Sequence, residues 1–177
     1  MAAVLGMDTA AIEKICEETP GTVSIANYNC PGQIVITGEA DAIQAAVARL
    51  TGAGAKRCVP LKVSGPFHSG MLTGAGEKLA KELEAVTVHE ISVPYIANVT
   101  ADYVAKTEDV KPLLEKQVSS SVRWQQTIER MLADGVDTFI EIGPGKTLSG
   151  FMRKINRDVK VLNVEKVEDL EKLMQIC

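Results

Sequence analysis

Short apolar runs and helix-like repeats alternate along the first third of the chain. Runs of the strand type are found at Ala2–Leu5, Val23–Tyr28, Ile34–Thr37 and Cys58–Val63. Between the first and second runs, and again between the third and fourth, apolar side chains recur every three or four residues, as on one face of a helix. The order strand, helix, strand, strand, helix, strand predicts a ferredoxin-like β-α-β-β-α-β unit.

The remainder of the chain also alternates helical and strand patterns. Helical spacing predicts helices at Leu72–Val86, Glu108–Gln117, Trp124–Ala133, Thr147–Ile155 and Asp169–Ile176. Apolar runs predict strands at Val93–Ala97, Thr138–Ile142 and Val159–Asn163, and the second of these is expected to be buried. The alternation indicates α/β layers, although three strands are few for a free-standing sheet. We therefore predict a small domain at residues 1–62 and part of a larger one at residues 63–177.

Composition limits the classes of protein to which the chain can belong. Its 177 residues suffice for one domain or two small ones, and a hydrophobic fraction of 46% can form a core. The net charge of −4 argues against nucleic-acid binding, because phosphate contacts require a concentrated basic surface. No apolar run approaches the ~18 residues of a membrane span. Four cysteines without paired CxxC spacing favour a reducing cytoplasm.

The strongest candidate for chemistry is His68, one of two histidines in the chain. It follows the apolar run that ends at Val63, and Gly65 and Pro66 break the strand pattern before it. An imidazole at the end of a strand is placed where α/β folds carry their chemistry, and it can transfer protons near neutral pH. Taken alone, a single histidine in an apolar chain is more often structural.

Three other patterns leave functional and structural interpretations open. Asn27 and Asn29 alternate along a strand and should share one face, where they would contact a substrate or satisfy turn hydrogen bonds. Arg57 belongs to a two-residue basic spot that is either a binding site or a solvated turn. The Gly-Pro-Gly-Lys-Thr sequence at 143–147 is not a Walker A motif, because Ile140 stands where the first glycine is required, and a tight turn is favoured.

Two further functional classes are compatible with these residues. A ferredoxin-like unit could serve as a binding or regulatory module without catalysis, although fold alone is weak evidence for that. A hydrolase that pairs Cys30 or Cys58 with His68 would use a thiolate nucleophile.

Five segments, taken together, carry a resemblance to a known family. They include Asn-Tyr-Asn-Cys-Pro-Gly-Gln within residues 26–36, residues 54–57, Gly-Pro-Phe-His-Ser at 65–69, residues 117–124 and Glu-Ile-Gly-Pro-Gly-Lys at 141–146. In order and spacing the set resembles the C-terminal part of malonyl-CoA:acyl carrier protein transacylases, over essentially the whole chain. The resemblance implies a ferredoxin-like subdomain followed by the later half of an α/β hydrolase-like domain.

The resemblance also implies an activity and the residues that perform it. Malonyl would pass from coenzyme A to a serine and then to the phosphopantetheine thiol of acyl carrier protein, in cytoplasmic fatty acid biosynthesis. His68 matches the general base, and Gln117 matches the residue whose main-chain carbonyl accepts a hydrogen bond from that imidazole. Phe67 resembles the phenylalanine that disfavours branched acyl groups.

More distant contacts follow from the same resemblance. Asn27 and Asn29 would line the substrate cleft, while Arg57 and Arg153 would meet coenzyme A phosphate or the acidic carrier. The resemblance implies no metal and no cofactor, with malonyl-CoA as substrate.

The chain departs from the family at one decisive point. The family's nucleophile lies in a Gly-His-Ser-Leu-Gly-type elbow, and no Gly-x-Ser-x-Gly sequence occurs in this chain. The glutamine of the oxyanion hole and the arginine that pairs with the malonyl carboxylate belong to the same N-terminal part of the family. We therefore expect the chain alone to be inactive, and the missing N-terminal part to be a possible partner.

Overall fold

The computed structural model describes residues 1–174. Contacts divide the chain into two compact units, Met1–Thr127 and a second unit that begins at Ile128. Both units combine helices with small sheets, so the protein is of mixed α/β type, as the alternating sequence patterns predict. None of the helices in residues 1–174 is long and apolar enough to cross a membrane. The predicted domain boundary after residue 62 stays a prediction.

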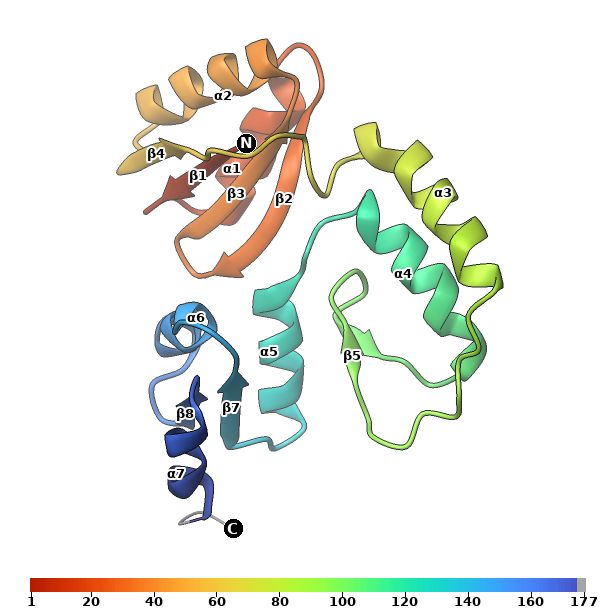
Figure 1. The fold of residues 1–177 in the computed structure, drawn as a ribbon. Helices are drawn as coiled ribbons and strands as arrows, with labels where there is room; N and C mark the ends of the chain where they lie inside the picture. Colours follow the sequence, from red (N-terminus) through yellow and green to blue (C-terminus); the bar gives the residue numbers. More distant parts are fainter. Residues whose placement is uncertain (175–177) are drawn as a thin grey trace. The chain divides into compact units, whose positions relative to one another are not determined.

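A four-stranded antiparallel sheet forms the start of the first unit (Figure 1). Its strands are β1 (Ala2–Leu5), β2 (Val23–Cys30), β3 (Gln33–Gly38) and β4 (Arg57–Pro60), in the order β2-β3-β1-β4. The helices α1 (Thr9–Glu18) and α2 (Ala40–Gly52) connect β1 to β2 and β3 to β4. The predicted order of elements in this region is confirmed.

The core of this sheet lies on the face that both helices cover. Alternate residues of the central strands, including Val4, Ile34 and Ile36, pack with Ile12 of α1 and Leu50 of α2, and all five are fully buried. The period of two along the strands and of three to four along the helices therefore places apolar side chains in one layer between them.

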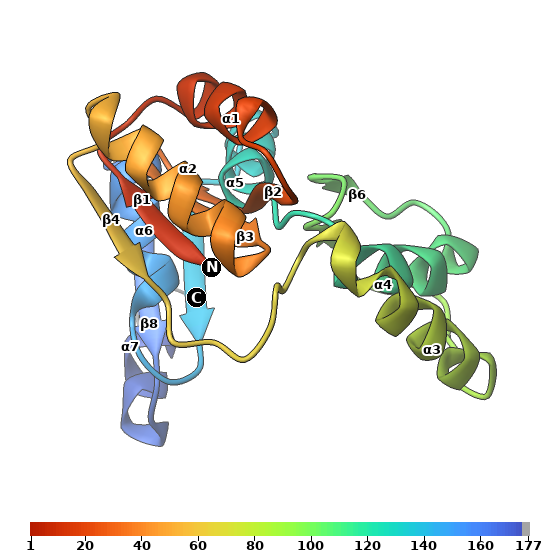
Figure 2. The same cartoon turned by 90° about the horizontal axis from the view of Figure 1, so that it is seen from above.

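The remainder of the first unit contains a pair of helices and a short hairpin. A 3₁₀ turn η1 (Gly70–Leu72) leads into α3 (Thr73–Glu84), and a second one, η2 (Thr107–Asp109), leads into α4 (Val110–Val118). Between them, β5 (Ile96–Ala97) pairs with β6 (Asp102–Tyr103). The helix α5 (Trp124–Ala133) crosses the boundary between the units. Helices α3 and α4 lie side by side (Figure 2). They approach each other closely at Gly76, where a Cβ would lie 3.0 Å from the Glu115 carbonyl oxygen.

The second unit is built on one βαβ connection. The strands β7 (Thr138–Ile142) and β8 (Lys160–Val164) are parallel, with Ile140 opposite Leu162, and α6 (Thr147–Ile155) joins them. The turn η3 (Val167–Asp169) and α7 (Leu170–Met174) follow. Ile142 is 76% exposed, so the expectation that β7 is buried is wrong for this chain. A pair of parallel strands cannot cover both of its own faces, which explains the exposure.

Glu141 fixes the turn between β7 and α6. Its carboxylate accepts hydrogen bonds from the N–H groups of Leu148 and Ser149 and from the Ser149 hydroxyl. Desolvation raises the pKa of Glu141, but these three hydrogen bonds outweigh it and lower the pKa below its usual value. The Gly-Pro-Gly sequence after Glu141 thus makes a tight strand-to-helix turn whose first helical N–H groups are already bonded to protein.

Several predicted boundaries are corrected by the structure. The strand predicted at Cys58–Val63 ends at Pro60, which is the last residue to pair with β1. The strand predicted at Val93–Ala97 shortens to β5, because Pro94 has no N–H for a ladder. The short strand β6 was not predicted. The predicted end of the last helix, Ile176, and the cysteine Cys177 lie outside the described residues.

Candidate active site

His68 and Gln117, which lie 49 residues apart in sequence, are brought together by the fold. The Nδ1 atom of His68 lies 3.2 Å from the main-chain oxygen of Gln117, in the last turn of α4. A carbonyl oxygen can only accept a hydrogen bond, so the contact requires the proton of the neutral ring to be on Nδ1. The lone pair of Nε2 is then available to accept a proton from another group.

The Gln117 side chain shapes the end of α4. Its amide Nε2 donates to the carbonyl oxygens of Ser120, at 3.0 Å, and Ser121, at 3.4 Å. The Gln117 carbonyl also accepts a hydrogen bond from the Ser120 N–H at 3.4 Å. The side chain therefore folds the following residues back over the helix end and holds the carbonyl that faces His68.

The segment after α4 is attached to the edge of the small sheet. The Ser121 hydroxyl donates to the Ile25 carbonyl at 2.6 Å. The Val122 N–H donates to the Ala26 carbonyl at 2.8 Å, and the Val122 carbonyl accepts from the Tyr28 N–H at 2.9 Å. Strand β2 is an edge strand of the sheet, and this segment satisfies part of its free edge. The position of the Gln117 carbonyl thus depends on the small sheet, a link that the sequence analysis missed.

Phe67 lies in the loop of His68, whereas Asn27 and Asn29 lie on β2, the strand to which the segment after α4 is attached. Phe67 directly precedes His68 and is 44% exposed. Asn27 pairs with Val35 on β3 and forms an isolated bridge with Val122. Asn29 lies at a register shift between Tyr28 and Cys30, so the strict alternation assumed for the two asparagines is interrupted there. The roles of all three stay predictions.

The two predicted basic residues lie in different units. Arg57 begins β4 opposite Leu5 and is exposed. Arg153 is exposed in the last turn of α6. It lines an open pocket of about 640 Å³ together with Lys154 and Arg157, two basic residues that the sequence analysis did not single out. Arg157 stands four residues after Arg153 and three after Lys154, about one helical turn from each, and this spacing was a signal that could have identified them.

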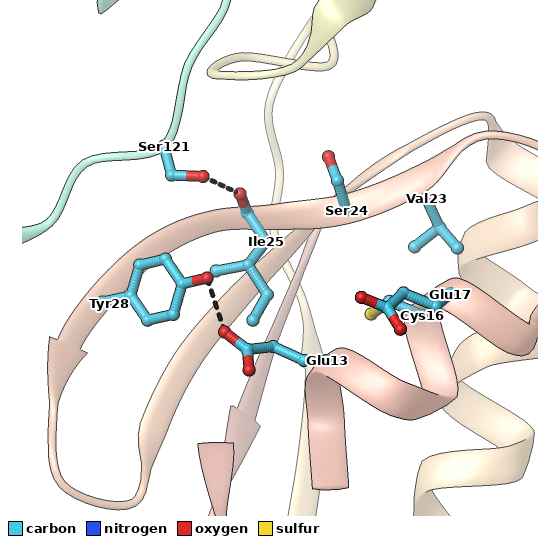
Figure 3. Close-up of a pocket in the computed structure, with 8 residues that line it drawn as sticks. All are labelled: Glu13, Cys16, Glu17, Val23, Ser24, Ile25, Tyr28 and Ser121. Carbon is cyan, nitrogen blue, oxygen red and sulfur yellow. Dashed lines mark hydrogen bonds between the residues drawn. The ribbon is translucent and has the colours of Figure 1, made fainter. Parts of the chain in front are cut away.

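A second open pocket, of about 240 Å³, lies between α1 and β2 (Figure 3). The Tyr28 hydroxyl donates to the Glu13 carboxylate at 2.8 Å in this pocket. Burial raises the pKa of Tyr28 to about 12, and the hydrogen bond and negative charge of Glu13 add to the rise. Burial likewise raises the pKa of the Cys16 thiol to about 11, so this cysteine is no thiolate nucleophile at neutral pH.

Replacing Glu13 with glutamine is expected to lower the pKa of Tyr28 from about 12 toward 10.0, because the acceptor loses its charge. A raised pKa in the folded state stabilises the protein below pH 10.0, and this stabilisation is lost as the pH rises through 12. Ultraviolet absorbance of tyrosinate measures the titration, and Tyr28→Phe identifies the affected group among the three tyrosines. An unchanged titration in Glu13→Gln would contradict the assignment.

The cysteines give no support to a Cys-His hydrolase. Cys30 is fully buried, so its thiol is closed to a substrate. Cys58 packs its side chain against the hydrophobic core of the small sheet. Cys30 therefore lacks the partial exposure that a catalytic thiolate needs.

An imidazole that contacts a main-chain carbonyl through Nδ1 has the orientation in which its Nε2 can act as a general base. The sequence profile described as "Acyl transferase domain" matches residues 1–171. The chain belongs to this acyl transferase domain family, which confirms the resemblance drawn from the sequence.

Known proteins similar to the chain agree with this family. The malonyl CoA-acyl carrier protein transacylase of Bacillus subtilis (strain 168) is 45% identical over 178 residues, covering 99% of this chain and 56% of the relative. The crystal structure of the transacylase of the same name from Clostridium perfringens is 43% identical with a TM-score of 0.94, over 99% of this chain and 56% of that chain. A chain in the structure of a type II polyketide synthase acyl-carrier protein in complex with its malonyl-transacylase is also similar. It is 32% identical to this chain with a TM-score of 0.95, over 99% of this chain and 58% of that chain.

The chain spans about half the length of the curated relatives that it matches.

Proposed function

We propose that the chain supplies the general base and part of the substrate cleft for malonyl transfer from coenzyme A to acyl carrier protein. The observation that carries the proposal is the contact between His68 Nδ1 and the Gln117 carbonyl, which leaves Nε2 free. Relatives of 40% to 45% identity are malonyl CoA-acyl carrier protein transacylases, which supports this substrate class.

In the first half-reaction, Nε2 of His68 accepts the proton of a serine hydroxyl while the serine oxygen attacks the thioester carbonyl. The sulfur of coenzyme A leaves as the carbon–sulfur bond breaks, and it receives the proton from the imidazolium. In the second half-reaction the same Nε2 takes the proton of the phosphopantetheine thiol, which attacks the malonyl-serine ester, and the serine oxygen receives that proton. The Gln117 carbonyl stabilises the imidazolium by accepting its Nδ1–H, the role that a carboxylate has in a triad.

The proposed site contains no metal or cofactor, and malonyl-CoA enters as substrate. Phe67 restricts the volume beside the acyl α-carbon, which discriminates by about 1 to 3 kcal/mol per methylene. Asn27 and Asn29 offer amide groups from the β2 side of the cleft. Arg57 and Arg153 attract coenzyme A phosphate or the acidic carrier, and for Arg153 the neighbouring Lys154 and Arg157 strengthen the positive potential.

The small sheet is proposed to be a ferredoxin-like subdomain covering residues 1–62, followed by the later half of an α/β hydrolase-like domain. Support for the first part comes from the connectivity β-α-β-β-α-β, the antiparallel order β2-β3-β1-β4 and the two helices on one face. For the second part, parallel β7 and β8 joined by α6 are the repeating unit of an α/β sheet.

The proposed reaction also uses groups from outside the residues described above. The proposed nucleophile, oxyanion hole and carboxylate anchor come from the part of the relatives that this chain does not span. Exposed Ile140 and Ile142 on β7 support packing of further elements of that part against this face, since parallel sheets are normally covered on both faces. We place the assembled enzyme in the cytoplasm, in fatty acid biosynthesis.

Transfer of radiolabelled malonyl from coenzyme A to acyl carrier protein tests the proposal. We expect no transfer by the chain alone, and transfer when it is co-expressed with the remaining N-terminal part of a close relative, such as that of Bacillus subtilis. That N-terminal part alone is the matched control. Transfer by the chain alone would reveal a nucleophile within it and overturn the serine mechanism.

A further inference from the structure

His68 has an unusual backbone conformation. Its φ angle is 58°, in the left-handed region. Among residues 1–174, Ala101 is the only other non-glycine residue with a positive φ. A residue with a Cβ occupies this region at an energetic cost, so neighbouring contacts must stabilise it. The direction of the imidazole depends on this backbone angle because the side chain leaves from the same Cα.

Ser69 makes the hydrogen bond that spans His68. Its hydroxyl donates to the carbonyl of Pro66 at 2.7 Å, which closes a short loop around Phe67 and His68. The Ser69 side chain is among the fully buried ones, with 2% of the residue exposed, so this bond is sheltered from water. Ser69 is itself fixed at the start of η1, where its carbonyl accepts from the Leu72 N–H at 3.0 Å.

We propose that Ser69 is a positioning residue for the general base. Its hydroxyl, bonded to the Pro66 carbonyl, holds His68 in the left-handed conformation that directs Nδ1 to the Gln117 carbonyl. The catalytic part of this inference rests on the proposed function, whereas the effect on the imidazole can be measured in the chain itself. Loss of the hydroxyl would leave the Pro66 carbonyl without its donor and allow the loop to relax toward ordinary backbone angles.

Thr73 provides a matched control. Its hydroxyl donates to the Gly70 carbonyl at 2.7 Å, so it has the same three-residue span and the same bond length as Ser69. That bond encloses no residue of the site. Thr73 is exposed whereas Ser69 is buried, so Thr73→Ala controls for the loss of a hydroxyl in this segment, and a change in the tautomer of His68 is expected only in Ser69→Ala.

The first test observes the imidazole directly. Nitrogen-15 NMR of histidine-labelled chain distinguishes the two neutral tautomers, and exposed His89 gives an internal reference. We expect His68 to carry its proton on Nδ1 in the unsubstituted chain, in Thr73→Ala and in Ser69→Thr, which keeps the hydroxyl. In Ser69→Ala we expect a mixture of tautomers, with His89 unchanged. Retention of the Nδ1–H form in a folded Ser69→Ala variant would overturn the proposal.

The second test uses the chain assembled with the N-terminal part of its relatives. Ser69→Ala should lower kcat by about 10- to 100-fold, the effect of a misplaced catalytic group, while KM for malonyl-CoA stays unchanged. Ser69→Thr should restore most of kcat. Equal losses in Ser69→Ala and Thr73→Ala, or a change confined to KM, would contradict positioning. If His68→Ala retains full activity, the proposed function fails instead, whatever the NMR result.

Discussion

Replacing His68 with asparagine in the assembled enzyme lowers malonyl transfer by about 10² to 10⁴-fold, the usual contribution of a general base. Asparagine tolerates the left-handed backbone at φ 58°, and its amide can still donate to the Gln117 carbonyl. It has no lone pair that accepts a proton at neutral pH. The variant therefore separates loss of the base from loss of the fold, and initial rates of malonyl transfer measure it.

The control for this substitution is His89→Asn, made at the second histidine of the chain. His89 is exposed and precedes β5 by several residues, so its replacement should leave both rate and stability unchanged. Thermal melting of His68→Asn should match that of the unsubstituted chain. Full activity in a folded His68→Asn variant would show that another group removes the serine proton.

Local signals in the sequence were enough to predict many elements of the fold. Residues 124–133, 138–142 and 147–155 form a helix, a strand and a helix with the predicted bounds. The first helix and the strand are each ended by a signal that lies close to it in sequence. Gly135 follows the helix, and the Gly-Pro-Gly turn follows the strand. The start of α1 is likewise local, because the Asp8 side chain accepts from the Ala11 N–H at its N-terminus.

Features that depend on distant contacts could not be derived in this way. The pairing of Ser121 and Val122 with the edge of β2 joins residues almost a hundred positions apart. The register shift at Asn29 arises within the sheet, and alternation along one strand cannot indicate it. The contact between His68 and Gln117 was expected only from the family resemblance, since no periodicity relates the two residues.

A core substitution in the small sheet should have the largest effect on stability. Ile36 on the central strand β3 is fully buried, between Ala2 of β1 and Ile25 of β2. We expect Ile36→Ala to lower the free energy of unfolding by about 2 to 5 kcal/mol, because it removes buried methylene groups and leaves a cavity. Urea denaturation followed by circular dichroism measures this loss.

The matched control is the same substitution at Ile142, which is exposed on β7 and should change the free energy of unfolding of the chain by less than about 0.5 kcal/mol. The Ile36 variant should also affect the site, because Ile25 carries the carbonyl that accepts from Ser121. Faster hydrogen exchange at the Val122 N–H, which donates to the edge of β2, would report this loosening. A destabilised Ile36→Ala variant with unchanged exchange at Val122 would mean that the segment holding the Gln117 carbonyl is fixed by α4 alone. The small sheet would then contribute to stability without positioning the general base.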